Sequence, residues 1–192
     1  DWFISDTSLK RGIPSSVSDY TVSFRYNDAQ SVYDLFDKHD DIAAVILEPA
    51  TSVEPKMIND EENFLQFLRR VCNENNCLLI LDEMITGFRW HLQGAQHLYG
   101  VDPDLSTFGK AMANGFSVAA LCGKREFMNL GGIKDAGLER TFLVSTTHGA
   151  EMCSLGAFVE CLKVYKEQDV VSHLNRYGSK LKKLGNEISK SL

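Results

Sequence analysis

The chain has 192 residues, of which 44% are hydrophobic and 24% are charged, the composition of an ordinary globular protein that buries a core without disulfides. Its 26 acidic and 20 basic residues give a formal net charge of -6, and no cluster of Lys and Arg points to a nucleic-acid-binding surface. No apolar run approaches the roughly 20 residues that a membrane-spanning helix needs, so neither nucleic acid nor a membrane is an expected partner.

The cysteines and the first residues bear on where the protein works. The five cysteines form no Cys-x-x-Cys pair, and Cys77 and Cys122 lie inside apolar runs, as small core residues do. This usage favours a reducing compartment, so we expect a cytoplasmic protein. The chain opens on Asp1-Trp-Phe-Ile without an initiator Met, which suggests a fragment, and a targeting segment can therefore precede it.

The first half of the chain predicts strands alternating with helices. The expected elements are a short strand at 21–26, a turn or helix N-cap at Asn27-Asp28, a helix at 29–39, a strand at 42–47, a helix at 61–73 and a strand at 77–81. The runs at 42–47 and 77–81 are continuously apolar, which is typical of strands buried on both faces. The amphipathic helix between them predicts a right-handed parallel crossover.

The second half continues the alternation and ends in helices. The expected elements are strands at 105–108 and 118–122, a loop at 131–139, a strand-like segment at 141–144 and helices at 150–166 and 170–188. The order of elements predicts the α/β class, with three layers and a mostly parallel sheet flanked by helices.

Charged residues follow three of the predicted strands. Glu48 follows the first buried strand, Asp82 and Glu83 end the second, and Lys110 follows the third. Ligands of open α/β sheets bind at the carboxyl ends of strands, and charged groups are costly to bury there without a partner. Solvation at the sheet edge explains any one of these residues equally well. Their convergence on one edge favours a site.

A lysine and an aspartate at such an edge suit pyridoxal 5'-phosphate (PLP). A buried aspartate keeps the pyridine nitrogen protonated, so that the ring can accept electrons from a substrate carbon. A lysine in an apolar site gives up its proton readily, forms a Schiff base with the cofactor aldehyde and then moves a proton. We therefore expect Lys110 and Asp82 to form a cofactor-holding pair.

A P-loop ATPase is the alternative for the same residues. The run that ends in Asp82-Glu83 also fits a magnesium-binding strand, but that class needs Gly-x-x-x-x-Gly-Lys-Ser/Thr elsewhere. Gly109-Lys110 is the single candidate; Ala111 follows it, and Asp104 occupies the leading glycine position. The candidate also lies after the acidic strand, so the pattern disfavours an ATPase.

Six segments carry a family resemblance that runs essentially from end to end. They are Tyr26-Asn-Asp28, Ala43-Ala-Val-Ile-Leu-Glu-Pro49, Leu79-Ile-Leu-Asp-Glu-Met-Ile-Thr-Gly-Phe-Arg89, Gly94-Ala-Gln96, Tyr99-Gly-Val-Asp-Pro-Asp-Leu105 and Thr107-Phe-Gly-Lys-Ala-Met-Ala-Asn-Gly115. The chain resembles the class III aminotransferases of PLP fold type I. Within them it is similar to the branch of glutamate-1-semialdehyde 2,1-aminomutase and related aminotransferases.

The resemblance implies roles for five residues. Lys110 would be the Schiff-base lysine and proton shuttle, Asp82 would bond the pyridine nitrogen, and Met84 would pack on the ring, where the family usually has Val or Ile. Thr147 would reach the cofactor phosphate of a neighbouring subunit, with Thr146 as the alternative. Glu48 matches a family glutamate near the site. The implied assembly is a homodimer with its sites at the interface.

The resemblance also implies a division of the chain. Residues 1–165 would be the PLP-binding large domain without its N-terminal part, and residues 166–192 a helix leading into a C-terminal small domain that is mostly absent. A fragment of this kind lacks part of the phosphate-binding site, so we expect it to bind PLP poorly and to be inactive by itself.

The implied substrates are a small-molecule amino donor and a carbonyl acceptor. Ile85 stands where the ω-amino-acid branch often has Gln, and His148-Gly-Ala-Glu151 resembles aminotransferases acting on sugar or polysaccharide precursors. An aminomutase-like enzyme and a sugar-precursor aminotransferase therefore both remain open. The alternative from another class is a non-catalytic fragment or pseudoenzyme that keeps the fold as an oligomerisation or binding module.

Overall fold

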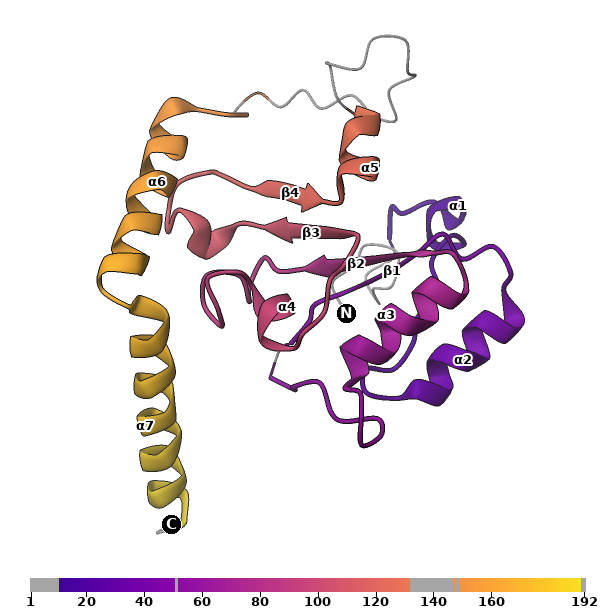
Figure 1. The fold of residues 1–192 in the computed structure, drawn as a ribbon, viewed down its shortest axis with the longest axis horizontal. Coiled ribbons are helices and arrows are strands. Elements are labelled where there is room, and N and C mark those ends of the chain that lie inside the picture. Colours follow the sequence, from indigo (N-terminus) through magenta and orange to yellow (C-terminus); the bar gives the residue numbers. More distant parts are fainter. Residues whose placement is uncertain (1–10, 51, 132–146, 148, 191–192) are drawn as a thin grey trace.

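A four-stranded sheet organises the chain in the computed structural model, which describes residues 11–50, 52–131, 147 and 149–190 (Figure 1). The elements are α1 (Ser15–Ser18), α2 (Ala29–Lys38), β1 (Ala44–Leu47), α3 (Phe64–Glu74), β2 (Leu78–Asp82), α4 (Ala95–Leu98), β3 (Leu105–Phe108), the 3-10 turn η2 (Lys110–Met112), β4 (Ala120–Gly123), α5 (Arg125–Met128), the 3-10 turn η3 (Asn129–Gly131), α6 (Met152–Glu167) and α7 (Val170–Lys190).

The sheet is mostly parallel, as the sequence predicted. Its order is β1-β2-β3-β4; β1, β2 and β3 run parallel, and β4 pairs antiparallel with β3 at one edge. Helix α3 connects the parallel pair β1 and β2, which confirms the predicted parallel crossover. Because parallel strands end on the same side, the segments after β1, β2 and β3 all emerge at one edge.

Helix α3 packs on one face of the sheet and forms the core there. The helix begins in a capping box: the Asn63 side chain accepts hydrogen bonds from the N–H groups of Leu65 and Gln66, and the Gln66 side chain accepts from the Asn63 N–H. Buried residues of α3 meet β1 and β2. This cluster comprises Val32, Val45, Leu47, Phe64, Leu65, Phe67, Leu68, Val71, Cys72, Cys77, Leu79, Leu81 and Val101.

The opposite face corrects the expectation that β1 is buried on both sides. Ile46 of β1 is 43% exposed and Leu121 of β4 is 45% exposed. Side chains alternate along a strand, so these residues lie on the face away from α3. Within the described residues, β1 is therefore buried on one face only.

The predicted strand at 21–26 is wrong. The segment is extended but has no strand partner among the described residues, and a strand needs a ladder to satisfy its backbone. Phe24 and Tyr26 instead pack against the core cluster. Asp28 caps α2 by accepting a hydrogen bond from the Ser31 N–H, as the sequence suggested.

The predicted helices near the C-terminus are confirmed as α6 and α7. Figure 1 shows α6 beside the turn that follows β3, and α7 extending away from the sheet. None of the described residues of α7 is buried. No helix within the described ranges is long and apolar enough to cross a membrane. Most of the predicted loop at 131–139 and all of the segment at 141–144 lie outside the described residues.

Buried Asp104 joins α3 to three strands at the amino end of the parallel sheet. One carboxylate oxygen accepts hydrogen bonds from the Leu79 N–H and from Arg69 Nη1, each at 2.7 Å, and the other accepts from Lys124 Nζ at 2.7 Å. Burial by itself raises the pKa of Asp104, but the bonds from Lys124, Leu79 and Arg69 outweigh it and hold the pKa below its usual value. The ionised carboxylate therefore stabilises the fold.

Replacing this carboxylate should destabilise the protein in a pH-dependent way. Asp104→Asn is expected to lower the free energy of unfolding by about 3 kcal/mol at pH 7, because Arg69 and Lys124 lose their charged partner. A lowered folded-state pKa stabilises above the unfolded value of about 3.9 and loses that effect as the pH falls through the folded pKa. Urea unfolding should show that the difference in free energy of unfolding between wild type and Asp104→Asn is smaller at pH 3 than at pH 7. Asp102→Asn, at an exposed neighbour, is the control and should be nearly neutral.

Candidate functional site

Three of the predicted site residues gather at the carboxyl edge of the parallel strands. Leu47 pairs with Leu81 and Asp82 pairs with Thr107, so Glu48 is level with Asp82, and Lys110 follows shortly after Thr107. Burial raises the pKa of Glu48 above its usual value; the nearby Asp82 carboxylate adds to the rise, and Lys110 opposes it. Both neighbouring charges therefore act on Glu48, which agrees with the expected convergence of the three residues at one edge.

Asp82 is oriented by its neighbours in the sheet. It is 9% exposed, and its Oδ1 accepts hydrogen bonds from Thr107 Oγ1 and from the Met84 N–H, both at 3.0 Å. Both bonds that described residues make to this side chain go to Oδ1, so Oδ2 keeps its lone pairs for another donor. Thr107 was missed as a site residue, although the parallel register of two short strands could have placed it beside Asp82.

Met84 packs against the backbone just before the lysine. A Cβ atom added at Gly109 would lie 2.9 Å from Met84 Sδ and closer still to Met84 Cε. The glycine therefore gives the thioether room at the carboxyl edge, one residue from Lys110. The predicted contact of Met84 with a cofactor ring stays a prediction.

Lys110 begins a tight turn. It is exposed and has a φ of 44°, which is uncommon for a residue other than glycine. Three backbone hydrogen bonds close the turn: the Met112 N–H donates to the Gly109 carbonyl at 2.9 Å, and the N–H groups of Ala113 and Asn114 donate to the Lys110 carbonyl at 3.4 and 3.1 Å. The turn presents the lysine at the same edge as Asp82.

Glu83 has a structural role that its position beside Asp82 did not reveal. It is fully buried; Oε1 accepts from the Gln96 N–H at 2.7 Å, and Oε2 accepts from the Ala95 N–H at 2.8 Å and from Thr86 Oγ1. A Cβ atom at Gly94 would lie 2.6 Å from Oε1, so only glycine fits there. The carboxylate thus holds both ends of the loop that follows Asp82.

The segment after Glu48 is held by the predicted Tyr26-Asn-Asp28 motif. Tyr26 Oη donates to the Pro49 carbonyl at 2.6 Å. Asn27 donates from Nδ2 to the Glu54 carbonyl at 2.9 Å and accepts from the Lys56 N–H at 2.8 Å. This motif therefore positions the loop beyond Glu48 from outside the sheet.

Thr147 is an exposed turn residue ahead of α6. Thr146, the alternative, lies outside the described residues. Within the part of the chain that the structure describes, no contact joins Thr147 to Asp82 or Lys110. Its proposed role needs a second subunit, which stays a prediction.

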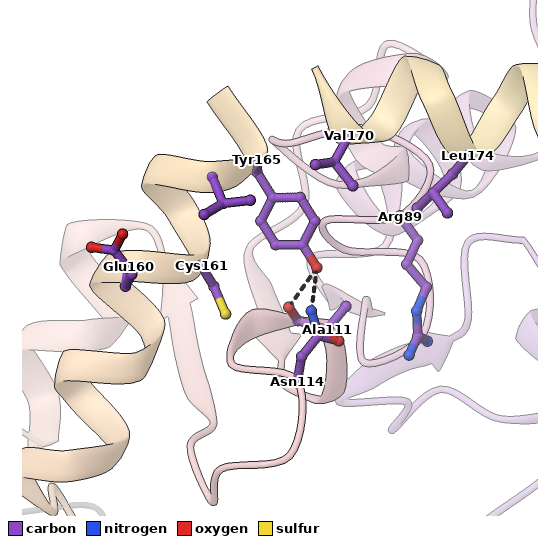
Figure 2. A pocket seen from close by; sticks show the side chains of 9 residues that line it. Arg89, Ala111, Asn114, Glu160, Cys161, Tyr165, Val170 and Leu174 are labelled. Carbon is purple, nitrogen blue, oxygen red and sulfur yellow. Dashed lines mark hydrogen bonds between the residues drawn. The ribbon is translucent and has the colours of Figure 1, made fainter. Parts of the chain in front are cut away.

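A cavity of about 420 Å³ lies between α6 and the turn residues Ala111 and Asn114 (Figure 2). Its lining residues are Arg89, Ala111, Asn114, Glu160, Cys161, Val164, Tyr165, Val170 and Leu174. Glu48, Asp82 and Lys110 are not among them. The cavity is therefore distinct from the edge where the charged residues gather, although both border the same turn.

The edge residues fit the two ends of PLP that need protein partners. Asp82 offers an oriented carboxylate with an open oxygen for a protonated pyridine nitrogen, and Lys110 offers a primary amine for the aldehyde. Met84 adds an apolar side chain against Gly109, next to Lys110. The chain thus carries the groups that this cofactor requires at its ring and its aldehyde.

Exchanging the buried glutamate for its amide tests the structural role of Glu83. In Glu83→Gln, an NH2 group replaces an oxygen that accepts from N–H donors, so the free energy of unfolding should fall by about 2 to 4 kcal/mol. Urea unfolding measures the change. Glu61→Gln, the same exchange at an exposed residue, should cost little, and equal effects of the two variants would contradict the assignment.

Removing the charge of Glu48 should raise the free energy of unfolding, whereas Glu83→Gln should lower it. The folded protein binds the Glu48 proton more tightly than the unfolded chain, because the folded-state pKa is raised. Ionised Glu48 therefore destabilises the fold above its folded pKa, and this effect vanishes below the unfolded value of about 4.3. Glu48→Gln should stabilise the protein at pH 8 and lose that advantage near pH 4. A variant less stable than wild type at pH 8 would show that the ionised form is favoured.

Known aminomutases and aminotransferases are similar to the chain. The chain is 37% identical over 171 residues to glutamate-1-semialdehyde 2,1-aminomutase 1 of Lachnoclostridium phytofermentans, covering 88% of this chain and 39% of that protein. It is 34% identical over 194 residues to 3-aminobutyryl-CoA aminotransferase of Cloacimonas acidaminovorans, covering 99% and 43%. The chain thus spans well under half the length of these relatives.

The fold leads to the same group of proteins. A solved structure of a transaminase with PLP bound superposes with a TM-score of 0.70 at 26% identity, covering 80% of this chain and 35% of that one. The family model described as aminotransferase class-III matches residues 13–191. This match extends over almost the whole chain, in agreement with the resemblance of its motifs, and the chain therefore belongs to the class-III aminotransferase family.

Proposed function

We propose that this chain carries the PLP-attachment part of an enzyme that moves an amino group from an amino donor to a carbonyl acceptor, or within one molecule. The observation that carries the proposal is the arrangement of Asp82 and Lys110: an oriented carboxylate with one open oxygen beside the turn that presents a lysine. The family and the relatives support the same chemistry.

Each residue of the edge has a task in this proposal. Asp82 Oδ2 would keep the pyridine nitrogen protonated, while Thr107 and the Met84 N–H keep the carboxylate in place through Oδ1. Lys110 would hold the cofactor through its amine and would then serve as the base at the substrate carbon. When bound, PLP supplies an electron sink for negative charge on that carbon.

Glu48 and Met84 are proposed to shape the substrate side. Glu48 lies near Asp82 and Lys110, and burial together with the Asp82 carboxylate raises its pKa above the usual value. Met84 covers the ring with an apolar, adaptable surface. Ile85, 38% exposed, adds no polar partner for a ring hydroxyl, unlike the glutamine expected in the ω-amino-acid branch.

The substrate is proposed as a small amino compound paired with a carbonyl compound. One relative is named an aminomutase and another an aminotransferase of 3-aminobutyryl-CoA, so both transfer within one molecule and transfer between two molecules are represented. A sugar or polysaccharide precursor is the second substrate class, favoured by the sequence around Glu151.

We further propose a homodimer in which Thr147 reaches the phosphate of a cofactor held by the other subunit. Residues 1–165 would belong to the large domain, and residues 166–192 would lead into a smaller one. The length of the relatives supports a longer active polypeptide, so the 192 residues alone should bind PLP poorly. The described cysteines are all free thiols, which supports a cytoplasmic enzyme.

The attachment of PLP to Lys110 is the test of this function. The longest natural polypeptide that contains these residues is mixed with PLP, and the visible absorbance is recorded. The amine displaces the aldehyde oxygen as water, and borohydride then adds hydride to the carbon–nitrogen double bond. Mass spectrometry should find the reduced cofactor on a peptide containing Lys110, and Lys110→Ala should abolish the adduct. Lys180→Ala, in α7, is the control and should keep it.

Two outcomes would contradict the proposal. An adduct of equal yield in Lys110→Ala would move the attachment to another lysine. A wild-type polypeptide without any adduct at saturating PLP would favour a non-catalytic module that keeps the fold.

An Asp82→Asn variant should retain the adduct but lose at least two orders of magnitude in transfer rate, because the ring nitrogen loses its anionic partner.

A further inference from the structure

A buried tyrosine of α6 is hydrogen-bonded to the turn that begins with Lys110. Tyr165 is 6% exposed; its hydroxyl donates to the Ala111 carbonyl at 2.9 Å and accepts from Asn114 Nδ2 at 2.8 Å. Figure 2 shows the tyrosine pointing from its helix toward Ala111 and Asn114. Both hydrogen bonds therefore end on residues that follow Lys110 within the same turn.

The turn at residues 110–114 has a backbone conformation that contacts with the rest of the molecule must stabilise. Lys110 and Asn114 have φ values of 44° and 43°, in the left-handed region that side chains other than glycine adopt at a cost. The bonds inside the turn join backbone groups of the turn itself. The bonds from Tyr165 come instead from a helix far along the chain, 54 residues from Ala111. They fix the turn relative to the rest of the molecule.

The ring of Tyr165 is fixed as firmly as its hydroxyl. Phe88 stacks on it with centroids 6.2 Å apart and planes 25° apart, and Phe88 also contacts Phe108 and Phe158 edge-on. Phe88 itself has a φ of 62°, and its backbone N–H donates to the His91 carbonyl at 3.1 Å. Phe108 ends β3, two residues before Lys110. The aromatic group therefore joins α6 to both segments that flank the edge site.

We infer that Tyr165 is a positioning residue for Lys110, which holds the lysine turn where its amine meets the cofactor aldehyde. Tyr165 acts through Ala111 and Asn114 and does not touch the reacting atoms. The inference rests on the proposed function in one respect, namely that the Lys110 amine takes PLP. Because α6 carries the tyrosine and contacts α7, the position of the lysine depends on helices from the end of the chain.

The variant Tyr165→Phe isolates the hydroxyl, since the phenyl ring keeps the packing with Phe88. Tyr177→Phe makes the same chemical change at a tyrosine of α7 that is 62% exposed, and it is the matched control. The first measurement is amide hydrogen exchange of the cofactor-free protein in peptides covering residues 109–115. Exchange there should rise roughly fivefold to thirtyfold in Tyr165→Phe, for the loss of one or two hydrogen bonds, and stay at the wild-type rate in the control.

Peptides from β2 serve as the internal reference for this measurement. Unchanged exchange in β2 shows that the turn, and not the whole protein, has loosened. Equal acceleration in β2 and in residues 109–115 would mean a general loss of stability and would overturn the inference. Wild-type exchange at residues 109–115 in Tyr165→Phe would overturn it too.

The second measurement is the rate at which saturating PLP attaches to Lys110, followed by visible absorbance in the longest natural polypeptide. Tyr165→Phe should slow attachment by a factor similar to the change in exchange, because the amine spends less time in position. An unchanged attachment rate with a lowered melting temperature would leave Tyr165 a purely structural residue. If the wild type attaches no PLP, the proposed function has failed, and the exchange comparison alone decides whether Tyr165 fixes the turn.

Discussion

The parallel pairing of β1, β2 and β3 is the constraint on which the candidate site depends. Parallel strands deliver Glu48, Asp82 and the Lys110 turn to one edge, whatever the intervening helices do. The strands are only four or five residues long, and a slip of one residue would turn Asp82 toward α3. Asp104 guards against such a slip, because it bonds to Leu79 through both its backbone and its carboxylate. Asp104, a buried acid at the amino end of the sheet, thus helps to keep Asp82 in place at the carboxyl end.

The two adjacent carboxylates at the end of β2 have different surroundings. Asp82 and Glu83 are consecutive, so they face opposite sides of the strand's line. Glu83 satisfies three donors in the interior and fixes the loop that carries Met84. Asp82 keeps one oxygen open at the edge. A buried carboxylate that holds the loop together therefore lies next to the carboxylate that we propose for the cofactor.

How far the sequence reached can be judged from particular residues. Helix α3 followed from its apolar spacing, and the edge site followed from acids and a lysine placed after apolar runs, because both patterns are local. The prediction of a strand at 21–26 was wrong, because a strand-like sequence pattern does not reveal whether a neighbouring strand exists to pair with it. The sequence could not distinguish the structural role of Glu83 from the expected role of Asp82, because the burial of Glu83 depends on the chain returning to it at Gly94. Tyr165 was missed because its partners lie 51 and 54 residues away.

The close approach of Gly94 to Glu83 has a consequence for the history of the sequence. A side chain at position 94 would occupy the space of the carboxylate, and the φ of 84° at Gly94 disfavours a side chain as well. Conversely, a shorter acid at position 83 would leave the N–H groups of Ala95 and Gln96 unmet. Each residue therefore removes the alternatives of the other. Among relatives that keep this loop, Glu83 and Gly94 should therefore be retained together.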